Sequence, residues 1–232
     1  MREIIFDTET TGLNPATGDR MVEIGCVEIV NRVETGRVFH AYFNPGRDMP
    51  AEAEAVHGLS TLFLSDKPSF GDKAEELLEF IGGDPLVAHN ASFDFGFLNH
   101  ELQTCGRPPV CLTRMRDTLT LARTRHPGAK HSLDALCVRF GIDRSHRVKH
   151  GALLDAQLLA QVYVELTGGR QIGLGLAPAA SVAVTASIGD LQAKRIPLAP
   201  RPHEASAEEV DRHRAFIARL SGALWDRLGL AS

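Results

Sequence analysis

Over the first 43 residues, apolar side chains occur in short runs that polar residues interrupt, a pattern typical of β-strands. Residues 2–6 form an apolar run that stops at Asp7. Residues 21–30 and 37–43 are rich in β-branched and aromatic side chains. The pattern therefore predicts three strands in a meander.

From residue 70 onward the spacing of apolar side chains becomes helical. Residues 70–81 carry apolar residues at positions i, i+3, i+4 and i+7 and are followed by two glycines, which predicts an amphipathic helix. Residues 85–89 (PLVAH) predict a buried strand that leads into a helix over 92–104. We expect an extended segment near 113–117 and further helices over 118–124, 132–140 and 152–166. Together these elements predict an α/β fold, with a mixed five-stranded sheet flanked by helices.

The composition changes after Thr167. Residues 169–205 contain many Gly, Ala, Pro and Ser and no sustained apolar period, which predicts a flexible linker after a folded domain spanning 1–168. Residues 206–232 recover a helical pattern that opens with a capping box, Ser206 and Glu209. Because a single helix of this length is unstable in isolation, we expect this C-terminal tail to dock on another surface.

Composition and charge limit the classes of protein. The 232-residue chain is 44% hydrophobic and 23% charged, the balance of a globular protein. Its net charge of −4 argues against holding long nucleic acid by bulk electrostatics, although an enzyme that grips only a chain end remains possible. No apolar run approaches the ~18 residues of a membrane span, and an acid follows within three residues of the start. We therefore expect a cytoplasmic protein without a membrane partner.

The cysteines suggest neither zinc nor disulfide bonds. They are widely spaced and form no CxxC pair, so the sequence predicts no zinc ribbon and no disulfide framework. We expect them to fill the core, and they are Cys26, Cys105, Cys111 and Cys137.

Two acids mark the end of the first predicted strand. Asp7 and Glu9 stand two positions apart, so in an extended chain both carboxylates point to one face. Two neighbouring carboxylates favour a cation. An ordinary acidic turn is the alternative interpretation, because Gly12 to Pro15 have the composition of a turn.

Two further acids occur where predicted helices begin. Asp94 falls in the first turn after the 85–89 strand, where an acid can also serve only to stabilise the helix. Asp155 stands among leucines and should face the core, and a buried carboxylate is rare unless it is paired or bound to a metal. His150 can approach Asp155 if it lies on the preceding loop, although a surface role is equally open.

Taken together, these four carboxylates and one histidine predict a hydrolytic site. Oxygen ligands suit Mg²⁺ or Mn²⁺. Two such ions ~3.5–4 Å apart can clamp the attacking and leaving oxygens of an in-line phosphoryl displacement. A neutral histidine can take the proton from the attacking water. This chemistry corresponds to phosphodiester hydrolysis.

Three segments resemble the motifs of a known family: FDTETTGL at 6–13, HNASFDFGFL at 89–98 and HGALLDAQLLAQVY at 150–163. They are similar to the three exonuclease motifs of the DEDDh 3′→5′ exonucleases, which have a ribonuclease H-like fold. The sequence around these segments is most similar to the epsilon, or proofreading, subunits of bacterial DNA polymerase III. The resemblance covers roughly residues 2–170.

The resemblance assigns roles to individual residues. It implies that Asp7, Glu9, Asp94 and Asp155 ligate two divalent cations, and that His150 is the general base. It further implies a pocket for the terminal nucleotides of a frayed single strand, lined by Thr8, Glu52, His57, Asn90 and Phe93. A core position for Phe93 and a capped loop position for His57 are the alternatives.

The resemblance also implies two protein partners. Residues 171–176 (QIGLGL) resemble a peptide that binds the sliding clamp, with Gln171, Leu174 and Leu176 as anchors and a leucine where an aromatic residue is common. The C-terminal tail, which holds the only tryptophan, Trp225, resembles the segment that docks on the polymerase catalytic (alpha) subunit. Trp225 could instead fold back onto the domain.

Three functions are compatible with these motifs and the C-terminal tail. The first is a proofreading exonuclease that removes mismatched 3′ nucleotides as nucleoside 5′-monophosphates. The second is a free-standing exonuclease for RNA or short oligonucleotides, which would need no docking tail. The third is a non-catalytic tether between clamp and polymerase, which would need no converging carboxylates. The sequence therefore favours the first.

Overall fold

A computed structural model describes residues 1–145, 147, 149–169 and 205–220. The chain divides into two compact units, Met1–Pro178 and Ala179–Ser232. The described part of the first unit holds the sheet and seven α-helices, and the described part of the second holds one helix. The predicted clamp-binding residues 171–176 and Trp225 lie outside the described residues. The predicted boundaries of domain, linker and tail stay predictions.

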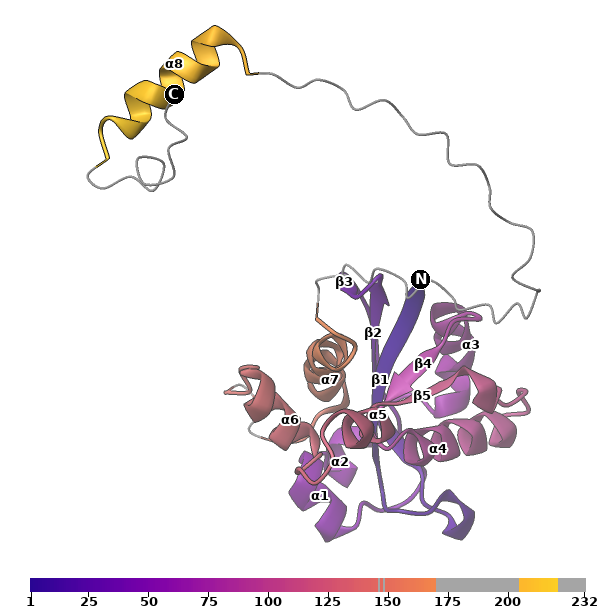
Figure 1. The fold of residues 1–232 in the computed structure, drawn as a ribbon. Helices are drawn as coiled ribbons and strands as arrows, with labels where there is room; N and C mark the ends of the chain where they lie inside the picture. The colour runs from indigo at the N-terminus through magenta and orange to yellow at the C-terminus, as the bar shows by residue number, and fades with distance from the viewer. Residues whose placement is uncertain (146, 148, 170–204, 221–232) are drawn as a thin grey trace, which may run out of the picture. The chain divides into compact units, whose positions relative to one another are not determined.

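The first unit is built on a mixed five-stranded sheet, as the sequence predicts (Figure 1). Its strands lie in the order β3-β2-β1-β4-β5. The pairs β1–β2 and β2–β3 are antiparallel, whereas β1–β4 and β4–β5 are parallel. The strands are β1 (Arg2–Thr10), β2 (Met21–Val30), β3 (Val33–Tyr42), β4 (Leu86–Ala88) and β5 (Met115–Asp117).

Two strands are longer than predicted. β1 does not stop at Asp7, because antiparallel pairing with β2 continues beyond it and places Asp7 opposite Gly25 and Glu9 opposite Glu23. β3 begins at Val33 because a two-residue turn joins it to β2. Both turn residues, Asn31 and Arg32, have positive φ, as a tight hairpin requires.

The structure contains the predicted helices and two further short ones. α1 and α2 fall between the predicted strand that ends at residue 43 and the helix predicted from residue 70. At seven and four residues, each is too short to show an apolar period. The helices are α1 (Ala51–His57), α2 (Thr61–Leu64), α3 (Phe70–Ile81), α4 (Ala91–Thr104), α5 (Thr118–Arg125), α6 (Leu133–Phe140), α7 (Ala152–Leu166) and α8 (Ala207–Ile217). Single 3₁₀ turns occur at Pro15–Thr17 and Leu112–Arg114.

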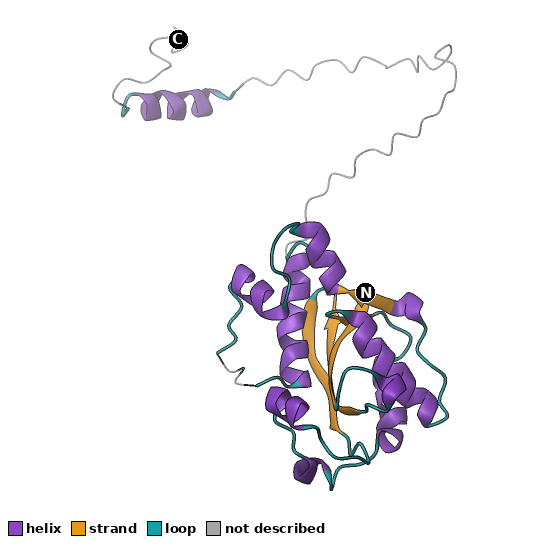
Figure 2. Ribbon diagram, turned by 90° about the horizontal axis from the view of Figure 1, so that it is seen from below, coloured by secondary structure: helices purple, strands orange, loops and turns teal. Residues whose placement is uncertain are grey.

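Helices cover both faces of the sheet (Figure 2). Because side chains of a strand alternate between faces, Ile4 and Phe6 pack against α3 and α4, whereas Ile5 packs against α7. A separate cluster joins α7 to α5 and α6. Asp7 and Glu9 share the alternation of Ile5, so they lie on the face that α7 covers.

One glycine allows α7 to approach the sheet closely. A Cβ atom added to Gly25 would lie 2.3 Å from the backbone of Leu153. Because Gly25 pairs with Asp7 across β1 and β2, this contact brings the first turn of α7 over Asp7. The first turn of α7 carries Asp155. The close approach therefore sets the distance between two of the predicted metal ligands.

The cysteine prediction is correct for two positions. Cys26 and Cys137 are buried in the core. It is wrong for Cys111, which lies exposed in the loop before β5, and Cys105 is only half-buried at the end of α4. All four cysteines are unpaired in the structure.

No helix in the described part of the chain is both long and apolar enough to cross a membrane.

Candidate active site

The structure brings the four predicted carboxylates and His150 around one cavity of about 280 Å³. Asp7 and Glu9 come from β1, Asp94 from the first turn of α4 and Asp155 from the first turn of α7. Glu9, Asp94 and Asp155 are buried and Asp7 is partly exposed. Carboxylates from three elements therefore converge, as the sequence predicts.

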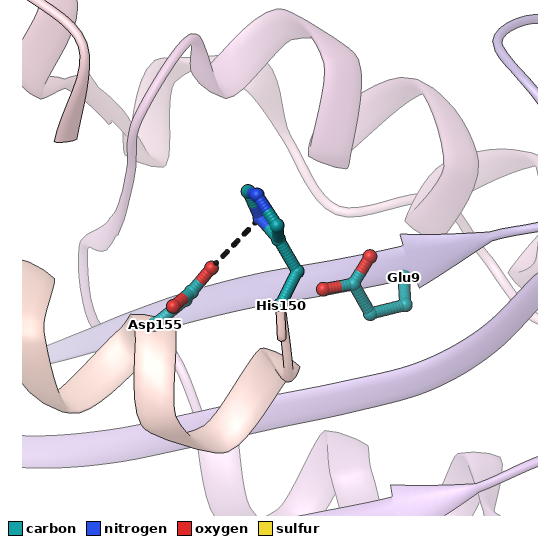
Figure 3. Close-up of side chains that lie close together, drawn as sticks. All are labelled: Glu9, His150 and Asp155. Atoms are coloured by element: carbon teal, nitrogen blue, oxygen red, sulfur yellow. Dashed lines mark ion pairs between the residues drawn. The ribbon is translucent and has the colours of Figure 1, made fainter. Parts of the chain in front are cut away.

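Three of these residues lie close enough to share one ion. A ligand atom from each of Glu9, His150 and Asp155 lies within 4.8 Å of the other two. His150 stands on the loop before α7 and its Nδ1 is 3.3 Å from Asp155 Oδ2, the contact drawn as a dashed line in Figure 3. The loop position of the histidine is the arrangement that the five-residue spacing requires.

A hydrogen bond orients the fourth carboxylate. Thr8 lies on the opposite face of β1 from Asp7 and Glu9, and its hydroxyl donates to Asp94 Oδ1 at 2.7 Å. Asp117 directs the entry of the same helix, because its carboxylate accepts from the backbone amide of Asn90 at 3.1 Å. Asn90 adopts a left-handed conformation with φ of 64° at the start of α4. It is not among the residues that line the carboxylate cavity or the neighbouring one described below, and its nucleotide contact stays a prediction.

The electrostatics of the cluster favour a cation. Burial raises the pKa of Asp7 well above its ordinary value, and the charges of Asp94 and Glu9 add to this effect. Burial, reinforced by Glu23, raises the pKa of Glu9 to about 8. Burial also raises the pKa of Asp94 to about 7, against the opposing hydrogen bond from Thr8. Because the donors are carboxylate oxygens in an excess of negative charge, the site fits hard divalent cations.

Arg147 is a site residue that the sequence analysis missed. Its Nε lies 2.5 Å from Asp155 Oδ1 and its Nη2 2.6 Å from Asp155 Oδ2, a bidentate ion pair. Its Nη1 donates to Asp134 of α6 at 2.9 Å, and Nη2 donates to His150 Nδ1 at 2.7 Å. Arg147 thus joins the loop that carries His150 to both α6 and α7. Its only signal in the sequence is a basic residue three positions before the histidine.

A second cavity, of about 340 Å³, adjoins the carboxylates. It shares Thr8, Glu9 and Phe93 with the first cavity. Four of the five residues predicted to bind the terminal nucleotides line it: Thr8, Glu52, His57 and Phe93. The remaining wall comes largely from the turn after β1 and from α1. The short helix α1 is therefore part of this chamber.

His57 lines this chamber, and apart from a weak interaction with the backbone of Thr10 its ring is available to a ligand. Its Nδ1 accepts from the backbone amide of Leu59 at 3.0 Å, so in the neutral ring Nε2 carries the proton. Burial lowers the pKa of His57, which favours the neutral ring. The Nε2 atom is buried and has no hydrogen-bond partner among the described residues. An oxygen atom of a ligand would satisfy it.

The raised pKa values predict how stability depends on pH without metal. Asp94 and Glu9 bind protons more tightly in the folded chain than in the unfolded chain, so the folded state loses stability as the pH rises through about 7 and 8. In EDTA, the Tm should fall between pH 6 and pH 9. The stabilisation by added Mn²⁺ should grow over the same range. Thermal unfolding scans with and without Mn²⁺ measure both, and a Tm in EDTA that rises across this range would contradict the raised pKa values.

Comparison with known proteins agrees with this geometry. The family model described as Exonuclease matches residues 4–163. The DNA polymerase III subunit epsilon of Rickettsia conorii is 48% identical over 225 residues, which cover 95% of this chain and 96% of the relative. The Escherichia coli K12 protein of the same name is 48% identical over 176 residues, covering 73% of this chain and 72% of the relative.

Solved structures show the same fold. Exonuclease X in complex with 5′ overhanging duplex DNA has a TM-score of 0.55 and 26% identity, and the match covers 71% of this chain and 90% of that chain. The zinc-bound E. coli ExoI–ssDNA complex has a TM-score of 0.61 at 18% identity, with 72% and 41% covered, and supports the fold alone. The chain therefore belongs to the exonuclease family and has its ribonuclease H-like fold. Within that family it belongs to the epsilon subunits of DNA polymerase III.

Proposed function

We propose that this protein proofreads DNA for a replicative DNA polymerase III by removing nucleotides from the 3′ end of a single-stranded or frayed strand. Hydrolysis of the terminal phosphodiester bond would release nucleoside 5′-monophosphates. The convergence of Asp7, Glu9, Asp94, Asp155 and His150 beside a chamber of nucleotide size carries this proposal. The high identity to proteins named as epsilon subunits supports it.

The carboxylates would hold two divalent cations, Mg²⁺ or Mn²⁺. When bound, such a pair supplies positive charge to the attacking and leaving oxygens of phosphoryl transfer. The carboxylate positions are well supported for this role, because β1 presents Asp7 and Glu9 on one face and the helix starts present Asp94 and Asp155. Thr8 would keep Asp94 in its ligating orientation through the 2.7 Å hydrogen bond.

His150 would remove the proton from the attacking water. A general base must be able to reach water, and the side chain of His150 is 49% exposed at the mouth of the site. The Nη2 atom of Arg147 lies 2.7 Å from His150 Nδ1 and holds the ring at the site. Arg147 would act as a positioning residue through this contact.

The neighbouring chamber would receive the terminal nucleotide. Phe93 lines both cavities and offers an apolar face to an unpaired base, a contact worth roughly 1–3 kcal/mol in such sites. His57 Nε2 would donate to an oxygen of that nucleotide, and Glu52 stands exposed at the wall. Because only an unpaired end can enter, a mispaired terminus, which frays more readily, would be removed preferentially.

The partners follow from the family and from the sequence beyond the domain. We propose that residues 206–232 dock on the polymerase catalytic (alpha) subunit and that residues 171–176 bind the sliding clamp through Gln171, Leu174 and Leu176. The capping box of α8 and the exposed apolar side chain of Phe216 on that helix support a docking role. The protein would act in the cytoplasm with these partners.

The function is tested by digesting three substrates with the full chain in Mg²⁺: a 3′-mismatched DNA primer, a matched primer and an RNA strand of the same sequence. We expect nucleoside 5′-monophosphates from the mismatched primer, slower release from the matched one and little from RNA. EDTA should abolish all release. Activity on RNA equal to or above that on DNA would contradict proofreading, and products released from the 5′ end would contradict the polarity.

A further inference from the structure

One segment of this acidic chain is strongly basic. Residues 118–150 contain two acids, Asp134 and Asp143, against seven Lys or Arg residues, an excess of five positive charges in a chain whose net charge is −4. The segment covers α5, α6 and the loop that leads to α7. The basic residues are Arg123, Arg125, Lys130, Arg139, Arg144, Arg147 and Lys149.

Part of this segment forms a shallow groove that shares two lining residues with the catalytic cavity. The groove has a volume of about 670 Å³ and lies along α6 and the residues before it. We call it the α6 groove, and it is lined by Lys130, Ser132, Asp134, Ala135, Val138, Arg139 and Arg144. Ser132 and Asp134 line the catalytic cavity as well. A polymer that leaves the catalytic cavity past these two residues enters the α6 groove.

The α6 groove carries positive charge that the protein does not neutralise. Lys130 and Arg139 are exposed and form no ion pair within the described part of the chain. Among the described residues, Asp134 is the only acid lining the groove, and it accepts from Arg144 at 2.8 Å and from Arg147 at 2.9 Å. Its negative charge is therefore already offset. The groove is suited to an anionic ligand.

We propose that the α6 groove binds the phosphodiester backbone of the strand under degradation, on the 5′ side of the terminal nucleotides. This inference rests on the proposed function. The terminal-nucleotide chamber adjoins the catalytic cavity through Thr8, Glu9 and Phe93, whereas the α6 groove adjoins it through Ser132 and Asp134. The carboxylates thus lie between a chamber with an aromatic wall and a groove with a basic wall. A strand cleaved at the carboxylates would place its end in the chamber and its preceding phosphates in the groove.

The lining of the α6 groove indicates what the contact recognises. Its described residues include no aromatic side chain on which a base could stack, so its cations would contact phosphates without regard to sequence. Such contacts release condensed counterions, and for single strands the logarithm of affinity falls by roughly 0.7 per contact for each tenfold rise in salt. The affinity for the strand should therefore depend on the length of the strand and on ionic strength, although the protein carries a net charge of −4.

The test uses Lys130→Ala combined with Arg139→Ala in the full chain, because neither residue touches the carboxylates or His150. Lys73→Ala with Arg107→Ala removes the same charge from exposed residues outside the described cavities and serves as the matched control. Hydrolysis of a dinucleotide and of a 12-nucleotide single strand is followed in Mg²⁺ between 50 and 200 mM salt. A third substrate is the same strand annealed to a complement, with a frayed 3′ end.

We expect the groove variant to raise KM for the 12-nucleotide strand on the order of 10-fold at 0.1 M salt, with kcat unchanged. Two lost contacts should reduce the salt slope by about 1.4. The dinucleotide should be hydrolysed as by the unmodified protein, and the control variant should match the unmodified protein on all substrates. Failure of the unmodified protein to hydrolyse any of the substrates would refute the proposed function instead.

Three results would overturn the groove assignment while leaving the proposed function intact. The first is an unchanged KM for the 12-nucleotide strand. The second is an equal loss on the dinucleotide, which would indicate a disturbed catalytic cavity. The third is a loss confined to the annealed substrate, which would place the complementary strand in the α6 groove.

Discussion

Replacing Asp7 by asparagine should abolish hydrolysis and at the same time stabilise the metal-free protein. The amide keeps the shape of the side chain but removes a charge from a cluster in which burial and neighbouring carboxylates already raise the pKa of Asp7. We expect activity to fall by at least roughly 10²–10³-fold, as when one group that stabilises transition-state charge is lost. In EDTA at pH 8.5 the Tm should rise, by about 2–4 °C for each kcal/mol of repulsion removed.

The pH dependence separates this explanation from simple repacking. Below its raised pKa the wild-type carboxyl is protonated and already neutral, so the gain in Tm should shrink as the pH is lowered. Asp66→Asn is the matched control, because Asp66 lies on the surface and forms its ion pair with the neighbouring Lys67. It should change neither activity nor Tm appreciably. A destabilised Asp7→Asn protein in EDTA at high pH would show that Asp7 is held by contacts other than repulsive ones.

The convergence of acids was predictable because each stands at a position that local pattern can identify. Asp7 and Glu9 share a strand face through the two-residue period, and Asp94 and Asp155 each fall in the first turn of a helix. The parallel arrangement of β1 and β4 then brings the end of one strand beside the start of α4. Local pattern plus sheet topology is sufficient for this part of the site.

Arg147 and Gly25 could not be identified in the same way. Arg147 lies in a loop, where side chains follow no regular period. Its role depends on the contact with Asp134, which lies thirteen positions earlier on α6. Gly25 reads as an ordinary strand residue until its pairing with Asp7 and its contact with Leu153 are known. Both residues act through tertiary contacts, which no local period encodes. The full wall of the nucleotide chamber could not be predicted either, because α1, which forms part of it, is too short to produce a helical pattern.

Without metal, the four carboxylates of the site differ in the positive charge that lies next to them. Asp7, Glu9 and Asp94 have no bidentate basic partner in the described part of the chain, and their pKa values are raised. Asp155 alone receives the guanidinium of Arg147 on both oxygens. Without metal, these three carboxyl groups therefore bind protons more readily than usual, whereas the fourth is held beside His150 by its ion pair with Arg147. Loss of the histidine should consequently leave the carboxylates in place.

Replacing His150 by alanine should lower kcat by roughly 10²–10⁴-fold, the usual contribution of a general base. KM should change little, because His150 lines the catalytic cavity and not the nucleotide chamber. Its exposed side chain leaves an open space, so added imidazole should restore part of the activity, increasingly as the imidazole becomes neutral. His100→Ala on α4, outside both cavities, is the control and should behave as the unmodified protein. A loss below about tenfold would exclude His150 as the base. A large loss without any imidazole rescue would indicate that His150 acts by holding Arg147 and Asp155 in position.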